Sequence, residues 1–146
     1  MRKFIAVLLS LLSLILFGCS AHSADIQNIK WNMSTVQDSD ASTVLYCSRD
    51  IAASFPEAKV VSAKAVFSKD SFQITFSEEN TGYSGTYAPS PKTSPALKLY
   101  ELHFEDGSTA LASFGSTEYR DGTKTPTLII SGERYTAYFY PSKEER

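Results

Sequence analysis

Alternation of apolar and polar residues is the strongest pattern in the chain from residue 43 onward. Apolar side chains recur at every second position over residues 63–67 and again over residues 72–76, and four polar residues separate the two runs. Strict alternation is typical of strands that bury one face. The two runs are therefore predicted to pair as an antiparallel hairpin.

Turn sequences divide the C-terminal half in the same way. Asp-Gly pairs at 106–107 and 121–122 and a Ser-Gly pair at 131–132 separate strand-like runs over residues 97–105, 109–114, 116–120, 127–130 and 133–140. Asp-Gly between apolar runs favours a hairpin, because both central residues of the favoured turn need a positive φ. The pattern predicts an all-β fold, an antiparallel meander that forms a small barrel or sandwich.

Three segments do not follow this clear alternation. Residues 49–55 contain helix formers between Ser48, which could cap a helix, and Pro56, which ends one, so one short helix is predicted there. Residues 87–95 contain three prolines, which cannot donate hydrogen bonds to a central strand, and this predicts an exposed loop. Residues 26–33, around the single tryptophan Trp31, could form a first short strand.

The first eighteen residues have the pattern of an export signal. Arg2 and Lys3 precede an apolar stretch over residues 4–17, which is shorter than the about 20 residues that a spanning helix needs. The following Leu16-Phe17-Gly18-Cys19 resembles the lipobox of bacterial lipoproteins, in which the cysteine is acylated and becomes the new N-terminus. The resemblance implies anchoring in a lipid bilayer through Cys19. Ordinary signal peptidase cleavage after Ala21 or Ala24 is the alternative.

Ser20 sets the expected location of the lipoprotein. It is not the aspartate that resembles the inner-membrane retention signal of enteric lipoproteins, so we expect an outer-membrane anchor facing the periplasm. The alternative processing would give a soluble periplasmic protein. The chain is thereby divided into a signal peptide at 1–18, a tether and possible first strand at 19–42, and a single β domain at 43–146.

Charge excludes one class of partner. Removing residues 1–18 leaves 128 residues, and the loss of Arg2 and Lys3 changes the balance from 14 basic against 16 acidic residues to 12 against 16, a net charge of −4. With no run of Lys and Arg, nucleic acid is not expected as a partner. A basic protein would be attracted weakly.

Candidate catalytic chemistry is sparse. His103 lies between Glu101 and Glu105 on one face of a predicted strand, but zinc sites usually combine more than one His or Cys, so a solvated strand face is expected instead. Cys47 has no intramolecular partner whether Cys19 is acylated or removed, and we expect its thiol to be buried. We predict no enzyme activity, no catalytic residue, no metal site and no cofactor.

The tyrosines gather in two clusters, Tyr83 and Tyr87, and then Tyr135, Tyr138 and Tyr140. These clusters are more informative, because tyrosine is favoured at recognition surfaces. Ser131-Gly132-Glu133-Arg134-Tyr135 resembles the Ser-Gly-x-x-Tyr loop of the bacterial membrane-bound and periplasmic inhibitors of C-type lysozyme, and Ser84-Gly85-Thr86-Tyr87 resembles the shorter Ser-Gly-x-Tyr form of related families. Tyr46-Cys47-Ser48 is similar to the early Tyr-x-Cys element of the C-type inhibitors. The resemblance implies that Ser131 and Tyr135 offer hydroxyls to the catalytic carboxylates of lysozyme, with Arg134 as an added donor.

These observations predict a lipid-anchored envelope binding protein that inhibits a lysozyme-like hydrolase. The candidate partner-binding residues are Ser131, Gly132, Arg134, Tyr135, Ser84 and Tyr87. Two alternatives stay open. The tyrosines could serve only cross-strand packing, and the protein could be a structural or assembly lipoprotein, or an immunity protein against a toxin, with a protein partner.

Overall fold

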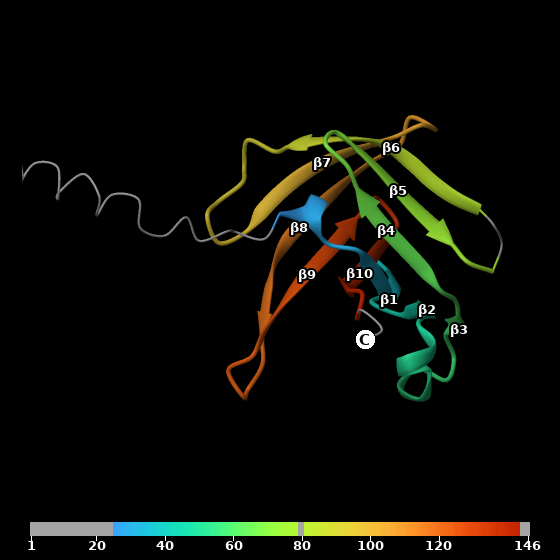
Figure 1. Ribbon diagram of the computed structural model, residues 1–146. Coiled ribbons are helices and arrows are strands. Elements are labelled where there is room, and N and C mark those ends of the chain that lie inside the picture. The colour runs from blue at the N-terminus through green and yellow to red at the C-terminus, as the bar shows by residue number, and fades with distance from the viewer. Residues whose placement is uncertain (1–24, 79–80, 144–146) are drawn as a thin grey trace, which may run out of the picture.

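A computed structural model describes residues 25–78 and 81–143. Its strands form one sheet in the order β10-β9-β8-β7-β6-β5-β4-β1-β2-β3, and β10 also pairs with β1. Eight of the strands, β1 and β4 to β10, thereby close into an antiparallel barrel (Figure 1). The elements in chain order are η2 (Ile26–Asn28), β1 (Trp31–Asp38), β2 (Val44–Cys47), η3 (Arg49–Ser54), β3 (Lys59–Val60), β4 (Ala63–Phe67), β5 (Ser71–Phe76), β6 (Thr81–Pro89), β7 (Lys98–Phe104), β8 (Thr109–Glu118), β9 (Lys124–Ser131) and β10 (Tyr135–Pro141).

The prediction of an all-β small barrel is confirmed. The hairpin predicted from alternation is β4–β5, in which Ala65 pairs with Ile74. Both Asp-Gly pairs do lie in turns, and Gly107 and Gly122 have φ of 86° and 81°. Neither Asp106 nor Asp121 has a positive φ, so these are not the predicted turns with two positive-φ residues. The predicted short helix is η3, a 3-10 helix that begins after Ser48, although the Ser48 side chain makes no capping hydrogen bond.

The strand boundaries differ from the prediction in three places. Residues 109–114 and 116–120 belong to one continuous strand, β8, because Gly115 pairs with Thr127 without a break. β6 has no counterpart among the predicted strands, since its two glycines and its polar residues weaken the alternation. The start of the predicted exposed loop at 87–95 is wrong, because residues 87–89 belong to β6 and Tyr87 and Ser90 are buried. β1 extends through the polar residues 34–38, so the barrel begins inside the range 19–42 assigned to the tether and possible first strand.

The interior of the barrel is filled by side chains. Trp31, Leu102, Leu128 and Phe139 are fully buried or nearly so, and the ring of Trp31 meets Phe114 edge-on at a centroid distance of 5.8 Å. These residues occupy alternate positions of their strands, which places them on the inner face. An eight-stranded barrel is just wide enough for side chains to fill it. The barrel is therefore a packed core.

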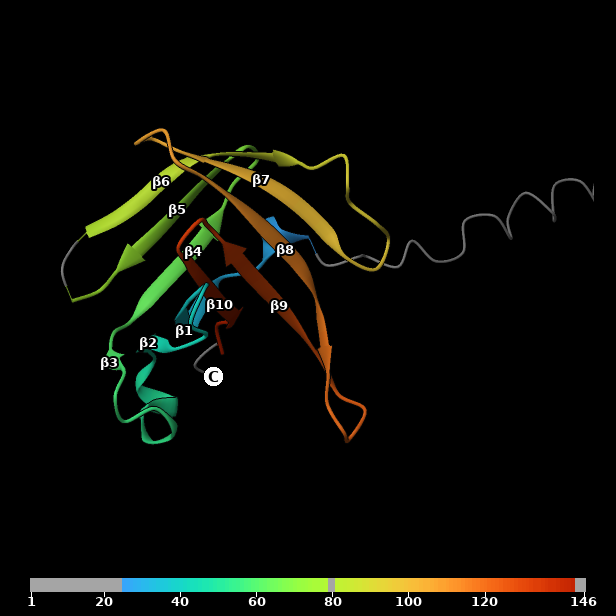
Figure 2. The same ribbon diagram turned by 180° about the vertical axis from the view of Figure 1, so that it is seen from behind.

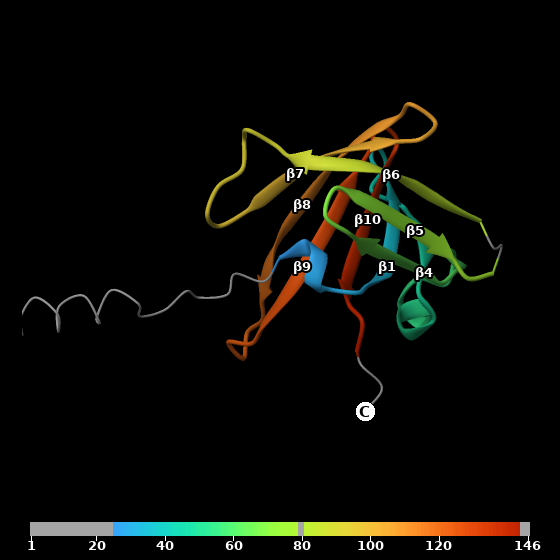
Figure 3. The same ribbon diagram turned by 45° about the horizontal axis from the view of Figure 1, so that its top comes forward.

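One end of the barrel is closed by η2, and we call it the closed end. Ile26 is fully buried, and its carbonyl accepts a hydrogen bond of 3.3 Å from Trp31 Nε1. Gln27 Nε2 donates to the carbonyl of Lys69 in the β4–β5 turn at 3.5 Å. Figures 1 and 3 show η2, in blue, against the strands at this end. The described chain thus enters the domain at its closed end.

A second feature projects from the barrel wall. β1 pairs with β4 only at Trp31 and Asn32, and farther along it pairs with β2 instead. β2, η3 and the short parallel strand β3 therefore form an extension outside the barrel, drawn in teal and green at the lower left of Figure 2. Among the described residues no helix has the length and apolar character needed to cross a membrane.

Candidate functional site

The end opposite η2 is open, and its rim includes four strand connections besides the entry of the chain into β4. Because neighbouring strands run antiparallel, the β1–β2, β5–β6, β7–β8 and β9–β10 connections all lie at this end. The inward-facing side chains nearest this end pack against the core but are only partly buried. They are Val36, Phe76, Phe104, Ala110 and Ala137. The two ends of the barrel therefore differ: one is covered by η2, and the other presents half-buried apolar side chains.

Tyr83 enlarges this apolar rim. It shares the inner face of β6 with the buried Tyr87 but lies nearer the open end, and 53% of its surface is exposed. Its ring meets Phe76 and Phe104 edge-on, at a centroid distance of 6.0 Å in each case. The contacts hold the exposed tyrosine ring in one orientation.

The Ser131–Tyr135 turn lies at the same open end. Tyr135 is 45% exposed, and the guanidinium of Arg134 lies 5.5 Å from the centre of its ring. The backbone N–H of Gly132 donates to the carbonyl of Tyr135 at 2.9 Å. The Arg134 carbonyl accepts a hydrogen bond of 2.9 Å from the N–H of Ser39, in the β1–β2 turn. The backbone of the turn is therefore held by one hydrogen bond within the turn and one from the β1–β2 turn. Its charged and aromatic side chains stay exposed.

The other candidate pair, Ser84 and Tyr87, is divided between the two ends. Tyr87 is 7% exposed, its ring contacts Phe67 and Tyr100, and its hydroxyl donates to the carbonyl of Ser68. Burial raises the pKa of this hydroxyl above its ordinary value. Ser84 is half-buried and lies near the open end, where its carbonyl accepts from the N–H of Glu105 at 3.0 Å. Tyr87 thus faces the core, with its hydroxyl already engaged.

The two Ser-Gly motifs are not brought together. β7 and β8 separate β6 from β9, and strands lie about 4.8 Å apart, so the two motifs are roughly 14 Å from each other across the sheet. Of the six candidate residues, the structure gathers Ser131, Gly132, Arg134 and Tyr135 on one turn. On β6 the exposed tyrosine is Tyr83, whereas Tyr87 of the Ser-Gly-x-Tyr motif is buried.

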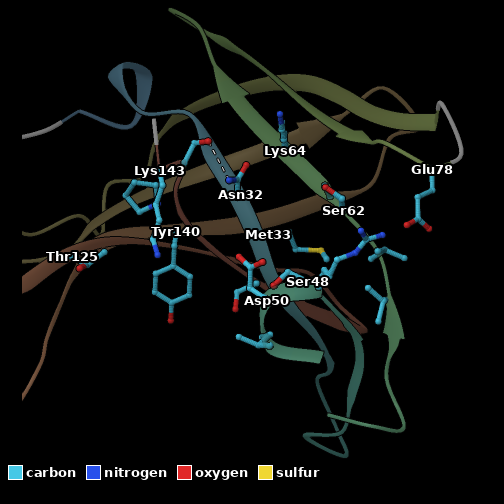
Figure 4. Close-up of a pocket in the computed structure, with 18 of the residues that line it drawn as sticks. Asn32, Met33, Ser48, Asp50, Ser62, Lys64, Glu78, Thr125, Tyr140 and Lys143 are labelled. Atoms are coloured by element: carbon cyan, nitrogen blue, oxygen red, sulfur yellow. Dashed lines mark hydrogen bonds between the residues drawn. The ribbon is translucent and has the colours of Figure 1, made fainter. Parts of the chain in front are cut away.

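An outer groove of about 1060 Å³ lies on the barrel wall beside the β2–η3–β3 extension (Figure 4). Its floor is a row of outward-facing residues on three adjacent strands, because Asn32 pairs with Tyr140 on one side and with Lys64 on the other. Tyr119 and Thr125 of the β8–β9 hairpin line one side, and Ser48 and Asp50 line the other. Figure 4 shows Asn32 between Tyr140 and Lys64.

Two tyrosines, Tyr119 and Tyr140, line this groove. Burial raises the pKa of the Tyr140 hydroxyl, and the neighbouring Tyr119 and Tyr138 raise it further. Asn32 Nδ2 donates to Ser142 Oγ at 3.1 Å, which fixes the segment after β10 against β1. The sequence pattern did not reveal this groove, because its residues come from several distant segments that only the closed barrel brings together.

Residues with catalytic or metal-binding chemistry are dispersed. Glu101 and His103 lie on the exposed face of β7, as the alternation predicts, and Glu105 is exposed in the connection that follows. Within residues 25–78 and 81–143 no group of three or more His, Cys, Asp or Glu residues is arranged to hold a metal ion. Cys47 is fully buried, as expected, and is free. Cys19 lies outside the described residues.

No protein-family model, no curated protein sequence and no solved structure matches the chain.

Proposed function

We propose that the protein is a binding protein of the bacterial envelope, anchored in the outer membrane through acylated Cys19, that inhibits a lysozyme-like hydrolase. The observation that carries this proposal is the Ser131–Tyr135 turn, which exposes Tyr135 and Arg134 at the open end of the barrel on a braced backbone. The turn inserts into the cleft of the hydrolase, where the hydroxyls of Ser131 and Tyr135 donate to carboxylates.

The packed interior favours a protein partner over a small ligand inside the barrel. Small-molecule sites are concave and bury most of their ligand, whereas Trp31, Leu102, Leu128 and Phe139 occupy the centre of this barrel. Tyrosine and arginine are enriched among residues that dominate binding energy at protein interfaces. A turn that is ordered before binding also loses less conformational entropy on association. These features support inhibition by surface contact.

The test is inhibition of a purified C-type lysozyme by the mature chain, residues 19–146, with Cys19→Ser so that no acyl chain is attached. We expect dose-dependent inhibition, and we expect Tyr135→Ala to weaken it by roughly tenfold or more, the loss of about 1.4 kcal/mol or more. Tyr119→Ala is the matched control, because Tyr119 is 47% exposed but lies on the β8–β9 hairpin at the other end of the barrel. Full lysozyme activity in excess protein would remove this function.

The anchor is tested separately in cells. A labelled fatty acid should be incorporated into the wild-type protein and not into Cys19→Ala, and the wild-type protein should fractionate with the outer membrane. Several acyl chains on one residue give stable anchoring, because each buried methylene contributes about 0.8 kcal/mol. Absence of label from the wild-type protein would instead support a soluble periplasmic protein.

The outer groove supports a second candidate function, that of an assembly or immunity lipoprotein with a protein partner. Its row of Tyr140, Asn32 and Lys64 lies on a different face from the Ser131–Tyr135 turn. This candidate predicts that Lys64→Glu releases a specific co-purifying partner. Under this candidate, Tyr135→Ala retains that partner and lysozyme is not inhibited.

A further inference from the structure

The carboxylates of the described domain are unevenly distributed between the two ends of the barrel. The four connections of the open end and the strand ends that flank them carry six carboxylates and one cation: Asp38, Asp40, Glu78, Glu105, Asp106 and Glu133 against Arg134. The closed end, counted in the same way and with the segments that enter and leave the barrel there, carries Lys30, Lys69, Lys92, Lys98, Arg120, Lys124 and Lys143 against Asp25, Asp70, Glu118 and Asp121. The open end is thus strongly acidic, although the whole protein is only mildly so.

Aromatic rings lie inside this acidic rim. Tyr83 and Tyr135 are each about half exposed, and Phe76 and Phe104 are partly buried behind Tyr83. Ring faces attract cations through their quadrupole, as the guanidinium of Arg134 over Tyr135 already shows within the protein. An acidic rim around exposed aromatic rings therefore complements a surface that presents lysine and arginine.

The direction of the chain places this surface away from the proposed anchor. Asp25, the first described residue, lies at the closed end, where η2 covers the barrel. Five residues lie between Cys19 and Asp25, so the six steps along the chain from one to the other span at most about 20 Å. A bilayer attached through Cys19 would then face the closed end, and the acidic end would face the periplasm.

We infer that the open end of the barrel is a docking surface for a basic protein, bound through lysine and arginine side chains that meet its carboxylates and its exposed tyrosine rings. This inference rests on the proposed function, because it names the chemistry of the partner at the same end of the barrel. Complementary charge accelerates encounter and disfavours acidic partners, and both effects weaken as salt screens the charges.

The test uses a library of random peptides displayed on phage, selected against the mature chain carrying Cys19→Ser. Binding of the selected peptides is then measured at several salt concentrations. Two quadruple variants with the same change of net charge are compared. One neutralises the open end with Asp40→Asn, Glu78→Gln, Glu105→Gln and Glu133→Gln, all exposed residues. The control neutralises Asp50→Asn, Glu57→Gln, Asp70→Asn and Glu118→Gln elsewhere on the surface.

We expect the selected peptides to be rich in Lys and Arg and to bind the open-end variant roughly tenfold more weakly or worse, with less than a twofold loss for the control. Circular dichroism melts should show both variants folded. The inference is overturned if the library yields no binders, if the binders are neutral or acidic, or if the two variants lose affinity equally. Failure of lysozyme inhibition, with basic peptides still bound at the open end, would instead remove only the proposed target.

Discussion

Gly85 lies where β6 and β7 approach each other too closely for a side chain. It pairs with Phe72 on one side and with Phe104 on the other. A Cβ atom built on Gly85 would lie 2.0 Å from the carbonyl oxygen of His103 and 2.9 Å from the Cα of Phe104. Both atoms belong to the backbone, so no rotamer change can relieve the contact. Gly85→Ala must therefore push β7 away from β6.

The size of this displacement sets the expected loss of stability. The His103 oxygen has to retreat by about 1.4 Å to reach 3.4 Å, the lower limit of ordinary van der Waals contact. Overpacking of this kind costs about 1–3 kcal/mol. The nearby hydrogen bond from the N–H of Glu105 to the carbonyl of Ser84, now 3.0 Å, would also be weakened, which adds about 0.5–1.5 kcal/mol. We expect Gly85→Ala to lower the free energy of unfolding by about 2–4 kcal/mol.

Urea unfolding followed by circular dichroism measures this loss. The matched control is Gly132→Ala in the second Ser-Gly motif, because a Cβ there would meet only the Tyr135 oxygen at 3.6 Å and Gly132 has no positive φ. The control should stay within about 1 kcal/mol of the wild type. If Gly85→Ala proved as stable as Gly132→Ala, the close approach of β6 and β7 would be wrong.

Three further predictions concern single side chains. Tyr87→Phe should reduce the free energy of unfolding by about 0.5–1.5 kcal/mol in urea, because the Ser68 carbonyl loses its partly buried hydrogen-bond donor, whereas Ala88→Ser on the exposed face of β6 should not. Cys47 should react with a maleimide reagent only at the rate of unfolding, because its thiol is fully buried; rapid labelling of the folded protein would contradict this. Hydrogen bonds from Thr123 lower the pKa of Asp121 below 3.8, so its contribution to stability is present above that value and is lost as the pH falls through the lowered pKa. The melting temperature of Asp121→Asn should consequently change less between pH 5 and pH 2 than that of the wild type.

Local pattern was sufficient for much of the fold. The β4–β5 hairpin, the two Asp-Gly turns and η3 each depend on neighbouring residues, and each was predicted from them. β6 was missed because two of its positions must be glycine: a Cβ on Gly82 would lie 2.6 Å from the Ile74 carbonyl oxygen, as one on Gly85 would approach His103. The same close approach that requires glycine removes the apolar alternation by which a strand is recognised.

The local pattern of apolar and polar residues could not predict the closure of the barrel either. It depends on β1, whose partner β10 lies about a hundred residues away, and the pairing of the two strands contains a register shift between Met33 and Thr35. The outer groove exists only because of this closure, since it joins Tyr140, Asn32 and Lys64. The Ser131–Tyr135 turn, in contrast, is formed by one hairpin, and the sequence located it correctly at a strand connection.

The two tyrosines of β6 show that the exposure of a side chain depends on its depth in the barrel as well as on the face of the strand. Tyr83 and Tyr87 occupy the same inner face of β6, four residues apart, which is about 13 Å along a strand. Tyr87 lies over the closed end, where η2 and Tyr100 bury it. Tyr83 lies at the open end, where no element covers it within the described residues. A periodic pattern assigns both tyrosines to the interior, so only the unequal covering of the two ends leaves Tyr83, together with Tyr135, exposed.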